Sequence, residues 1–568
     1  ERLEDRKIVY DPEEWAADRK ALKLTSDDIF SADEWLKSMR KLHCNIGKMR
    51  LETDINFLEI GQLNFKQKLV YDIVQSLFND VMEGKKTEQL FMNVSGQAGC
   101  GKSAALICLR RLFISKGMPN FMKIAAPTGT AAFLVKGITL HSLLRLPVNN
   151  SKEELKPLKD NEQLRDLQAT FKDVNLLVID EKSMIGQHMM YMIDQRLRQA
   201  KPTQAKEYCG GISVIFMGDF GQLVPVRDPA LFTKHEEGSK NIRNAQITSG
   251  QHIFDSLFVK NTIIMDEVMR QGKGQEKFKE CLDRLRNGDT TEEDWHYLRE
   301  KCELGGPNFT SEERKEIRNS AIKVCALNRD LRKHNIQRIK ALGKPIAAVK
   351  SENHGKGASS SPAKEAGNLL QDIIIAKGCR VLLSTNLWQE AGLTNGAVGE
   401  VKYIIYKEGE GPPELPALLI CKFDQYIGPP YLVGEEKTVP IVPLKRQWVS
   451  KLKQDCDRTM LPIKPGYAVS IHSSQGGTLD KVIVNLGPKE FAIGLAYVAC
   501  SRVRRIEDLY FDPMPNRRRF TSFKQTKTFK QRFDHDKREK IADEQFVATS
   551  LKMLERKERE KDSENINN

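Results

Sequence analysis

Eight consecutive residues at 96–103, Gly-Gln-Ala-Gly-Cys-Gly-Lys-Ser, have the types and spacing of a phosphate-binding loop. Glycines allow tight turns that direct backbone N–H groups at phosphate oxygens, and a helix N-terminus behind the loop adds partial positive charge. In this pattern the lysine reaches the β- and γ-phosphates and the Ser hydroxyl binds Mg²⁺. The nucleotide-binding residues predicted from the loop are Gly96, Gln97, Ala98, Gly99, Cys100, Gly101, Lys102 and Ser103.

The apolar run Leu176–Ile179 ends in two carboxylates, Asp180 and Glu181. A parallel sheet buries such strands on both faces and places its ligand at their carboxyl ends. An acidic pair after an apolar strand is common, so its interpretation depends on the phosphate loop. With that loop present, we expect Asp180 to hold Mg²⁺ and Glu181 to orient and deprotonate an attacking water.

Three further polar residues follow predicted elements in the way expected of groups that contact a γ-phosphate. Gln222 follows the apolar strand 214–217, Arg270 follows a strand that ends near Met265, and Arg502 ends the run Ala496–Arg502, which we expect to be helical. Gln222 would sense whether ATP is intact, and the two arginines fit arginine fingers. A solvated surface arginine is the alternative for Arg270. Two fingers on one nucleotide would place the site in a cleft between two lobes, whose closure could drive movement.

Two weaker signals lie on either side of the phosphate loop. Gln67 opens an amphipathic helix, and its amide could read an adenine edge, although an ordinary helix-surface glutamine is the simpler interpretation. The run 124–132 predicts a strand followed by a tight loop in which Thr128 and the backbone N–H of Gly129 suit a nucleic-acid phosphate. His141 is either a ligand-contacting residue or a structural histidine.

Composition restricts the class of protein. The 568 residues suffice for roughly three to five compact units. No apolar run approaches the roughly 20 residues that span a bilayer, so we expect neither a membrane segment nor a signal peptide. The eleven cysteines form no C-x-x-C pair, which argues against zinc and for a reducing, intracellular compartment. The net charge of +14 favours a polyanionic partner such as nucleic acid.

Outside these motifs, the sequence predicts alternating strands and helices, with strands in the second half at 322–328 and 380–386. Residues 1–56 look like a helical extension with Trp15 and Trp35 as packing anchors. Residues 344–368 are Gly/Ser-rich and are expected to form a mobile surface loop. From Pro513 the charged tail, 513–568, is expected to be helical, either as a solvated helix or as an auxiliary DNA-binding arm.

The motifs in order are a glutamine before the phosphate loop, G-x-x-x-x-G-K-S, A-P-T-G-T-A-A, I-D-E-x-S-M, G-D-F-x-Q-L, M-R-Q, I-H-S-S-Q-G and A-Y-V-A-C-S-R. Together they resemble superfamily 1B DNA helicases, in particular the Pif-type (petite integration frequency) helicases and the helicase domains of Helitron transposons. The resemblance covers about residues 60–512.

The resemblance implies an α/β fold with two RecA-like P-loop NTPase domains, each a parallel sheet flanked by helices. Domain 1A would occupy residues 57–265, with a small wedge, 1B, at about 142–170. Domain 2A would occupy residues 266–512, with a small β-barrel, 2B, inserted at about 396–460. Short β-rich runs at Val398–Tyr406 and Ala417–Phe423, separated by Gly-Pro pairs, support the barrel.

By the same resemblance, the chain would be an ATP- and Mg²⁺-dependent helicase that moves 5′ to 3′ on single-stranded DNA and unwinds forked or tailed duplexes. It would act in replication, repair, recombination or telomere maintenance, in the nucleus or the mitochondrion, with unknown protein partners. Residues at positions that line the DNA in relatives are Thr128, Gly129, His141, His472 and Ser474. Gln475 and Gly476 match positions near the nucleotide.

Four positions depart from the family pattern. Ser473 stands where relatives usually carry lysine, Val224 replaces a proline, Cys500 replaces an apolar residue, and Lys182 stands where a small or apolar residue is commoner. None of them is a phosphate, metal or finger position, so we expect an active ATPase. The alternatives are the helicase part of a Helitron-type transposase, a translocase that does not unwind, and a non-catalytic binding protein, against which the complete motif set argues. RNA as the substrate also stays open.

Overall fold

The computed structural model describes residues 22, 26–43, 59–147, 155–159, 161–234, 242–450, 454–490 and 492–567. Its contacts divide the chain into two compact units. Unit 1 comprises Glu1–Leu51 and Ile322–Ser473, and unit 2 comprises Glu52–Ala321 and Ser474–Asn568. These divisions differ from the boundaries expected for domains 1A and 2A, and the two-lobe assignment stays a prediction.

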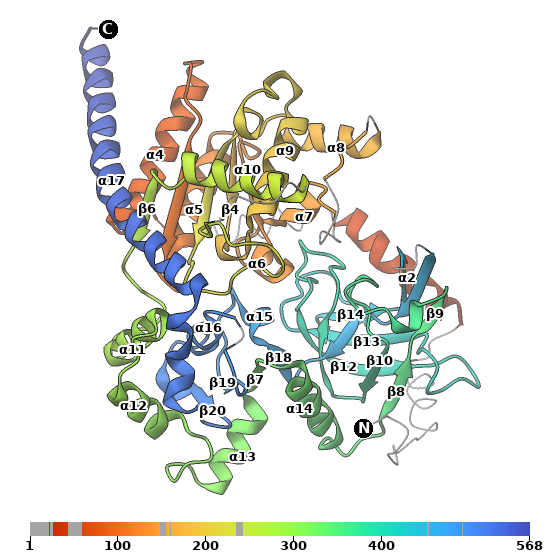
Figure 1. The fold of residues 1–568 in the computed structure, drawn as a ribbon. Coiled ribbons are helices and arrows are strands. Elements are labelled where there is room, and N and C mark those ends of the chain that lie inside the picture. The colour runs from red at the N-terminus through yellow and green to blue at the C-terminus, as the bar shows by residue number, and fades with distance from the viewer. Residues whose placement is uncertain are drawn as a thin grey trace. The chain divides into compact units, whose positions relative to one another are not determined.

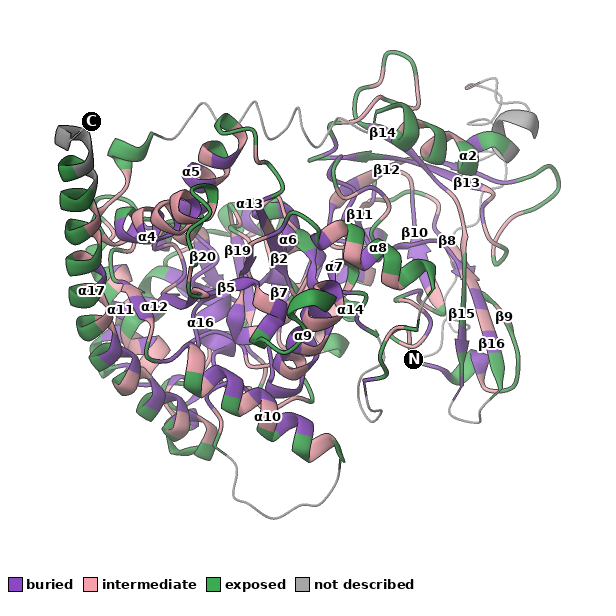
Figure 2. Ribbon diagram, turned by 90° about the horizontal axis from the view of Figure 1, so that it is seen from above, coloured by how far each residue is buried: buried purple, intermediate pink, exposed green. Residues whose placement is uncertain are grey.

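The centre of unit 2 is a six-stranded sheet in which every pairing is parallel. Its strands, in spatial order, are β3 (Ile138–Thr139), β2 (Met122–Ala126), β4 (Leu176–Ile179), β5 (Ser213–Gly218), β1 (Phe91–Gly96) and β6 (Thr262–Met265). Strands β1, β4 and β5 are buried along their whole length. Figure 2 shows this for β5. The buried parallel strands expected from the apolar runs are therefore confirmed.

Side-chain alternation along β4 explains why the sheet needs continuous apolar runs. Leu177 and Ile179 join one hydrophobic cluster, which includes Phe171 and Phe254. Leu176 and Val178 join a second cluster with residues of neighbouring helices. Because successive residues of a strand point to opposite faces, a sheet covered on both sides needs apolar residues at every position.

Helices of unit 2 surround this sheet and extend beyond it (Figure 1). Those before residue 260 are α4 (Phe65–Met82), α5 (Lys102–Ser115), α6 (Gly129–Leu134), α7 (Leu140–Leu143), α8 (Glu162–Phe171), α9 (Gln187–Ala200) and α10 (Ile242–Leu257). Those after it are α11 (Glu276–Asn287), α12 (Glu292–Cys302), α13 (Ser311–Ser320), α16 (Leu495–Cys500) and α17 (Lys527–Asn567). Two further parallel strands, β19 (Val482–Asn485) and β20 (Leu509–Phe511), pair with each other.

Unit 1 contains mainly antiparallel strands. A five-stranded sheet has the order β14 (Thr438–Ile441), β13 (Leu418–Phe423), β12 (Val398–Ile405), β11 (Arg380–Leu383) and β17 (Ile463–Pro465). The remaining strands are β15 (Leu444–Val449), β16 (Asp455–Met460), β9 (Glu352–His354), β8 (Ala347–Lys350), β10 (Asp372–Ile375), β7 (Ile322–Cys325) and β18 (Ala468–Ser470). Of these, β7 and β18 pair in parallel. The helices are α2 (Ser26–Leu42), α14 (Asn328–Lys340) and α15 (Ile471–Ser474), which ends on the first residue of unit 2.

Two expectations about unit 1 are wrong. The strand at 380–386 does not continue a strand–helix alternation, because β11 pairs antiparallel with both β12 and β17. The expected loop at 344–368 contains strands β8 and β9, and β9 pairs with β16, a strand about a hundred residues later in the chain. Arg458 on β16 fixes the Gly/Ser-rich segment by donating hydrogen bonds to the backbone oxygens of Ala358 and Ser361.

Other expectations are confirmed in the described residues. The chain has an α/β fold with a parallel sheet, the β-rich runs form β12 and β13, and the tail forms α17. Trp35 on α2 packs edge-on against Tyr431 at 5.3 Å between ring centroids, while Trp15 lies outside the described residues. The wedge and the barrel stay predictions. No helix among the described residues is both long enough and apolar enough to cross a membrane.

Candidate active site

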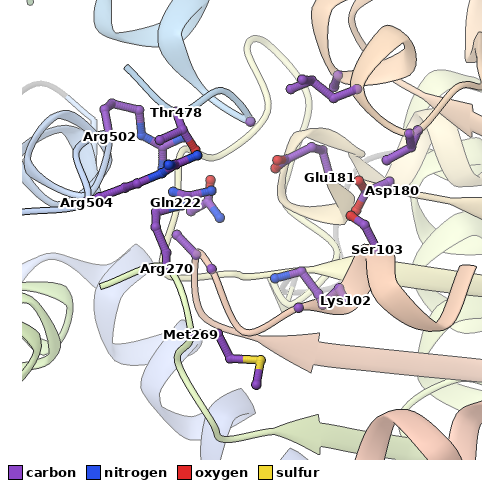
Figure 3. A pocket seen from close by; sticks show the side chains of 17 residues that line it. Lys102, Ser103, Asp180, Glu181, Gln222, Met269, Arg270, Thr478, Arg502 and Arg504 are labelled. Carbon is purple, nitrogen blue, oxygen red and sulfur yellow. The ribbon is translucent and has the colours of Figure 1, made fainter. Parts of the chain in front are cut away.

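A cavity of about 540 Å³ in unit 2 collects most of the residues predicted to act on a nucleotide (Figure 3). It lies at the carboxyl ends of the parallel strands, where β1 leads into the phosphate loop and β4 into the acidic pair. The predicted residues that line it are Ala98, Gly99, Gly101, Lys102, Ser103, Asp180, Glu181, Gln222, Arg270, Gly476 and Arg502. Because all of them belong to unit 2, the predicted cleft between two lobes stays a prediction.

The phosphate loop depends on glycine at two positions. Gly99 and Gly101 have left-handed backbones, with φ of 89° and 74°. A Cβ at Gly99 would lie 2.3 Å from Cβ of Arg270, and one at Gly101 would lie 2.4 Å from Nε2 of Gln67. Lys102 Nζ donates hydrogen bonds to the carbonyls of Gly96 (2.7 Å) and Gln97 (2.9 Å). The loop thus packs closely against two other predicted site residues.

Gln67 is buried at the N-terminus of α4, where it forms a reciprocal capping box with Asn64. Its Nε2 also donates, at 3.4 Å, to the carbonyls of Cys100 and Gly101. These hydrogen bonds connect the start of α4 to the phosphate loop. Recognition of adenine by Gln67 stays a prediction.

Charges within the cavity influence one another. Burial, followed by the charge of neighbouring Glu181, raises the pKa of Asp180 to about 7, although Lys102 acts in the opposite direction. Burial would lower the pKa of Lys102, but the Cys100 thiol and the carboxylates of Asp219, Asp180 and Glu181 outweigh it and raise that pKa. Lys102 therefore stays positively charged, which suits a phosphate ligand.

Glu181 has a left-handed backbone, with φ of 57°. Its Oε2 accepts a 3.0 Å hydrogen bond from Nε2 of Gln475, which also donates to Ser183 Oγ at 3.0 Å. The structure therefore brings Gln475 to the predicted base, although Gln475 does not line the cavity as Gly476 does.

Asp219 organises the turn that carries Gln222. Its Oδ1 accepts hydrogen bonds from Gly221 N and, at 2.8 Å, from Arg286 on α11. Burial would raise the pKa of Asp219, but Arg286 outweighs it and holds that pKa below its usual value. Gln222 is 3% exposed, and its Oε1 has no hydrogen-bond partner among the described residues. A buried, unsatisfied amide oxygen facing a cavity fits a site built for a polar ligand.

Three arginines lie opposite the carboxylates in Figure 3. Arg270 donates to Ser501 O at 3.0 Å. Arg502 is almost fully buried and donates to the backbone oxygens of Val498 (2.7 Å), Gly477 (3.0 Å) and Ser474 (3.4 Å). Burial, followed by the charge of Arg270, lowers the pKa of Arg502 to about 10. Arg504 is exposed at the cavity wall.

The residues present fit a nucleoside triphosphate and Mg²⁺. The phosphate loop is a glycine cradle that side chains would fill, and Lys102 and the arginines supply positive charge for phosphates. Ser103 and Asp180 contribute a hydroxyl and a carboxylate oxygen, which are the donors that Mg²⁺ prefers.

The predicted DNA-binding residues are divided between the units. Thr128 caps α6 by accepting a 3.2 Å hydrogen bond from Ala131 N, and Gly129 is the first residue of that helix. His141 lies on α7 and Ser474 is buried, all in unit 2, whereas His472 belongs to unit 1. Burial lowers the pKa of His472. Their contacts with DNA stay predictions.

Several contributors to the site were not identified from the sequence. Thr478 and Arg504 line the cavity, and each stands two residues after a predicted site residue. Tyr497 Oη accepts a 3.2 Å hydrogen bond from Ala98 N of the phosphate loop. Arg286 belongs to none of the sequence motifs, and its hydrogen bond to Asp219 joins residues that are 67 positions apart.

A phosphate loop and an acidic pair at the carboxyl edge of a parallel sheet, with arginines facing both, are the features that RecA-like P-loop nucleotide-binding proteins share. Comparison with known proteins makes this more specific. The model of the PIF1-like helicase family matches residues 62–296. The resemblance to Pif-type helicases that was predicted from the motifs is thereby confirmed.

Curated relatives agree with this family. ATP-dependent DNA helicase PIF1 of Xenopus laevis is 27% identical over 464 residues, which cover 79% of this chain and 63% of that protein. The human protein of the same name is 28% identical over 429 residues, which cover 74% of this chain and 58% of that protein. The chain thus spans about three fifths of the length of these two relatives.

Solved structures share the fold. Pif1 helicase from Candida albicans aligns with a TM-score of 0.60 and 21% identity, over 83% of this chain and 98% of that one. Pif1 helicase from Bacteroides, in complex with ADP-AlF3 and single-stranded DNA, aligns with a TM-score of 0.56 and 22% identity, over 80% and 97% of the two chains.

Proposed function

We propose that this protein is an ATP-dependent DNA helicase that moves 5′ to 3′ along single-stranded DNA and unwinds duplexes. The observation that carries the proposal is the single cavity in which the phosphate loop, the acidic pair, Gln222 and three arginines converge. Relatives named ATP-dependent DNA helicases support the substrate class.

The positions of the side chains support hydrolysis of ATP in this cavity. Lys102 and the phosphate-loop N–H groups bind the β- and γ-phosphates, while Glu181, restrained by Gln475, orients the attacking water and takes its proton. Arg270 and Arg502 neutralise the charge that develops on the transferred phosphoryl group. Mg²⁺, held by Ser103 and Asp180, would supply further charge neutralisation at the phosphates.

Movement along DNA would come from two RecA-like lobes, 1A and 2A, which close on ATP and open after hydrolysis. Opening one base pair costs about 1.4 kcal/mol of stacking on average, which is less than ATP hydrolysis normally releases. The 1B wedge would part the strands. Gln67 would contact the adenine base at the other end of the nucleotide.

The substrates would be single-stranded DNA and forked or tailed duplexes. The net charge of +14 favours contacts with phosphates, which give largely sequence-independent and salt-sensitive binding. Thr128, His141, His472 and Ser474 would contribute to the DNA track. Replication, repair, recombination and telomere maintenance, in the nucleus or the mitochondrion, are the settings that the family suggests.

The direct test compares Lys102→Ala with Lys116→Ala, which removes an exposed lysine after the other end of α5. We expect Lys102→Ala to abolish phosphate release stimulated by single-stranded DNA, and Lys116→Ala to retain it. Equal phosphate release by the wild type and Lys102→Ala would contradict the proposal. Strand separation on the same samples distinguishes a helicase from a translocase that does not unwind.

A further inference from the structure

Lys182 directly follows the predicted base Glu181, and its side chain is completely buried. A buried ammonium group requires polar and charged partners, because its desolvation is costly. Lys182 Nζ donates to Asn93 Oδ1 at 2.6 Å and also bonds Ser95 Oγ. Both partners lie on β1, the strand that ends in the phosphate loop. The side chain therefore links the segment that follows β4 to strand β1.

The countercharge comes from the C-terminal helix α17. Glu539 is 4% exposed, and its Oε1 lies 3.2 Å from Lys182 Nζ. The same carboxylate accepts hydrogen bonds from Asn93 Nδ2 (2.6 Å) and Ser95 Oγ (2.7 Å), and His535, one turn earlier, contacts it at 3.2 Å. The helix runs beside α4 and β6 (Figure 1). The tail, which we expected to be either a solvated helix or a DNA-binding arm, thus supplies a buried charge.

The same cluster extends to the turn that carries Gln222. Lys182 Nζ lies 4.3 Å from the ring centroid of Phe220, and the His535 ring meets that ring edge-on at 5.1 Å. A Cβ at Gly218 would lie 2.7 Å from Lys182 N and 2.9 Å from its Cγ, so this glycine provides the space for Lys182. The Lys182 side chain therefore contacts both β1, which leads into the phosphate loop, and the turn after β5 that carries Gln222.

The backbone conformation of Glu181 indicates what the buried contacts of Lys182 would stabilise. Its φ of 57° is a left-handed conformation that residues other than glycine rarely adopt. Such conformations persist when the surrounding structure over-determines them. Gln475 restrains the carboxylate of Glu181, and the buried Lys182 side chain restrains its backbone.

We propose that Lys182 and Glu539 are positioning residues of the ATPase, and that α17 holds the backbone of Glu181 in its catalytic position through this buried ion pair. Neither residue lines the cavity, so each acts through Glu181 rather than on the nucleotide. The inference rests on the proposed hydrolysis of ATP. It makes the C-terminal helix part of the ATPase.

Glu539→Gln tests the pair in the full-length chain, because it removes the charge and keeps the size of the side chain. We expect kcat for ATP hydrolysis to fall about 10- to 100-fold, since small displacements of a catalytic group have effects of this size. KM for ATP should change by less than about threefold, because the phosphate-binding groups are intact. Affinity for a fluorescent ATP analogue should likewise stay near that of the wild type.

Asp543→Asn is the matched control. Asp543 lies one turn further along α17 and is also largely buried, but it bonds Lys66 Nζ (2.6 Å) and Ile264 N (2.8 Å), away from Glu181. We expect this variant to lower the melting temperature and to keep the wild-type kcat at a temperature where it is folded. An equal loss of kcat in Asp543→Asn and Glu539→Gln would overturn the proposal, because the effect would then be a general loosening of α17.

The double variant Lys182→Gln/Glu539→Gln replaces the ion pair with two neutral amides. Since it leaves no unbalanced buried charge, we expect its kcat to be roughly tenfold higher than that of Glu539→Gln. Losses that multiply in the double variant would overturn the proposal. Each assay is run with and without DNA. If DNA does not change the rate of ATP hydrolysis, the result contradicts the helicase function. The effect of the variants on kcat would still test the role of the Lys182–Glu539 ion pair.

Discussion

Gln475 donates a 3.0 Å hydrogen bond to the carboxylate of Glu181, although 294 residues separate them in the chain. The bond joins the motif expected near the nucleotide to the predicted catalytic base. Gln475 is also held by Ser183 at 3.0 Å, so its amide has a fixed orientation. The carboxylate of the predicted base is therefore held by a residue that does not itself line the cavity.

Gln475→Ala is expected to lower kcat for ATP hydrolysis about tenfold or more, because Glu181 loses its orienting partner. KM for ATP should change little. Steady-state phosphate release measures both values. Gln531→Ala, which removes a half-buried glutamine of α17 that donates to Lys234 O at 3.0 Å, is the control and should behave as the wild type. A Gln475→Ala variant with unchanged kcat would show that the bond does not position the base.

Arg270 and Arg502 should differ when replaced by alanine. Both variants should lose about 10³-fold in kcat if the residues act as arginine fingers. Arg502→Ala should also destabilise the fold by about 3 kcal/mol, because three backbone oxygens lose a buried donor. Arg270→Ala removes one bond to Ser501 and should leave the melting temperature almost unchanged. Equal thermal shifts in the two variants would contradict this distinction.

Asp219→Asn should destabilise the protein in a pH-dependent manner. Arg286 holds the pKa of Asp219 below its usual value, so the stabilisation is present above the unfolded-state pKa and is lost as pH falls through the folded-state pKa. At pH 7 we expect a loss of about 3–5 kcal/mol, typical of a broken buried pair. Thermal unfolding should show a difference from the wild type that narrows below about pH 4. A difference that stays constant down to pH 3 would contradict the assignment.

Removal of Mg²⁺ should abolish hydrolysis, and Asp180→Asn should raise the Mg²⁺ concentration needed for half-maximal activity. The reason is that Asp180 and Ser103 supply the oxygen donors at the cavity wall. Titration of Mg²⁺ after treatment with a chelator measures this. If the two proteins show the same Mg²⁺ dependence, Asp180 is not a metal ligand.

Local sequence predicted most of the polar residues that line the cavity, because the motifs that contain them each span only a few adjacent residues. The phosphate loop and the acidic pair follow strands whose apolar runs are unmistakable, and parallel topology then brings them together. Short apolar runs are less informative about partners. The run at 380–386 did not indicate that β11 pairs antiparallel with β12.

Long-range partners could not be predicted. No sequence feature near Lys182 predicts that its partner is Glu539, which is 357 residues away. The pattern of charges in the tail also resembles that of a solvated helix. The Gly/Ser-rich composition of 344–368 likewise concealed the pairing of β9 with β16. Such contacts depend on which surfaces the completed fold brings together.

Unwinding of two DNA duplexes that differ only in whether the single-stranded tail is 5′ or 3′ tests the proposed helicase activity and its polarity in one assay. The wild type should separate the strands of the 5′-tailed duplex when ATP is present, and Lys102→Ala should not. Strand separation of the 3′-tailed duplex alone, or strand separation that survives the loss of Lys102, would contradict the proposal.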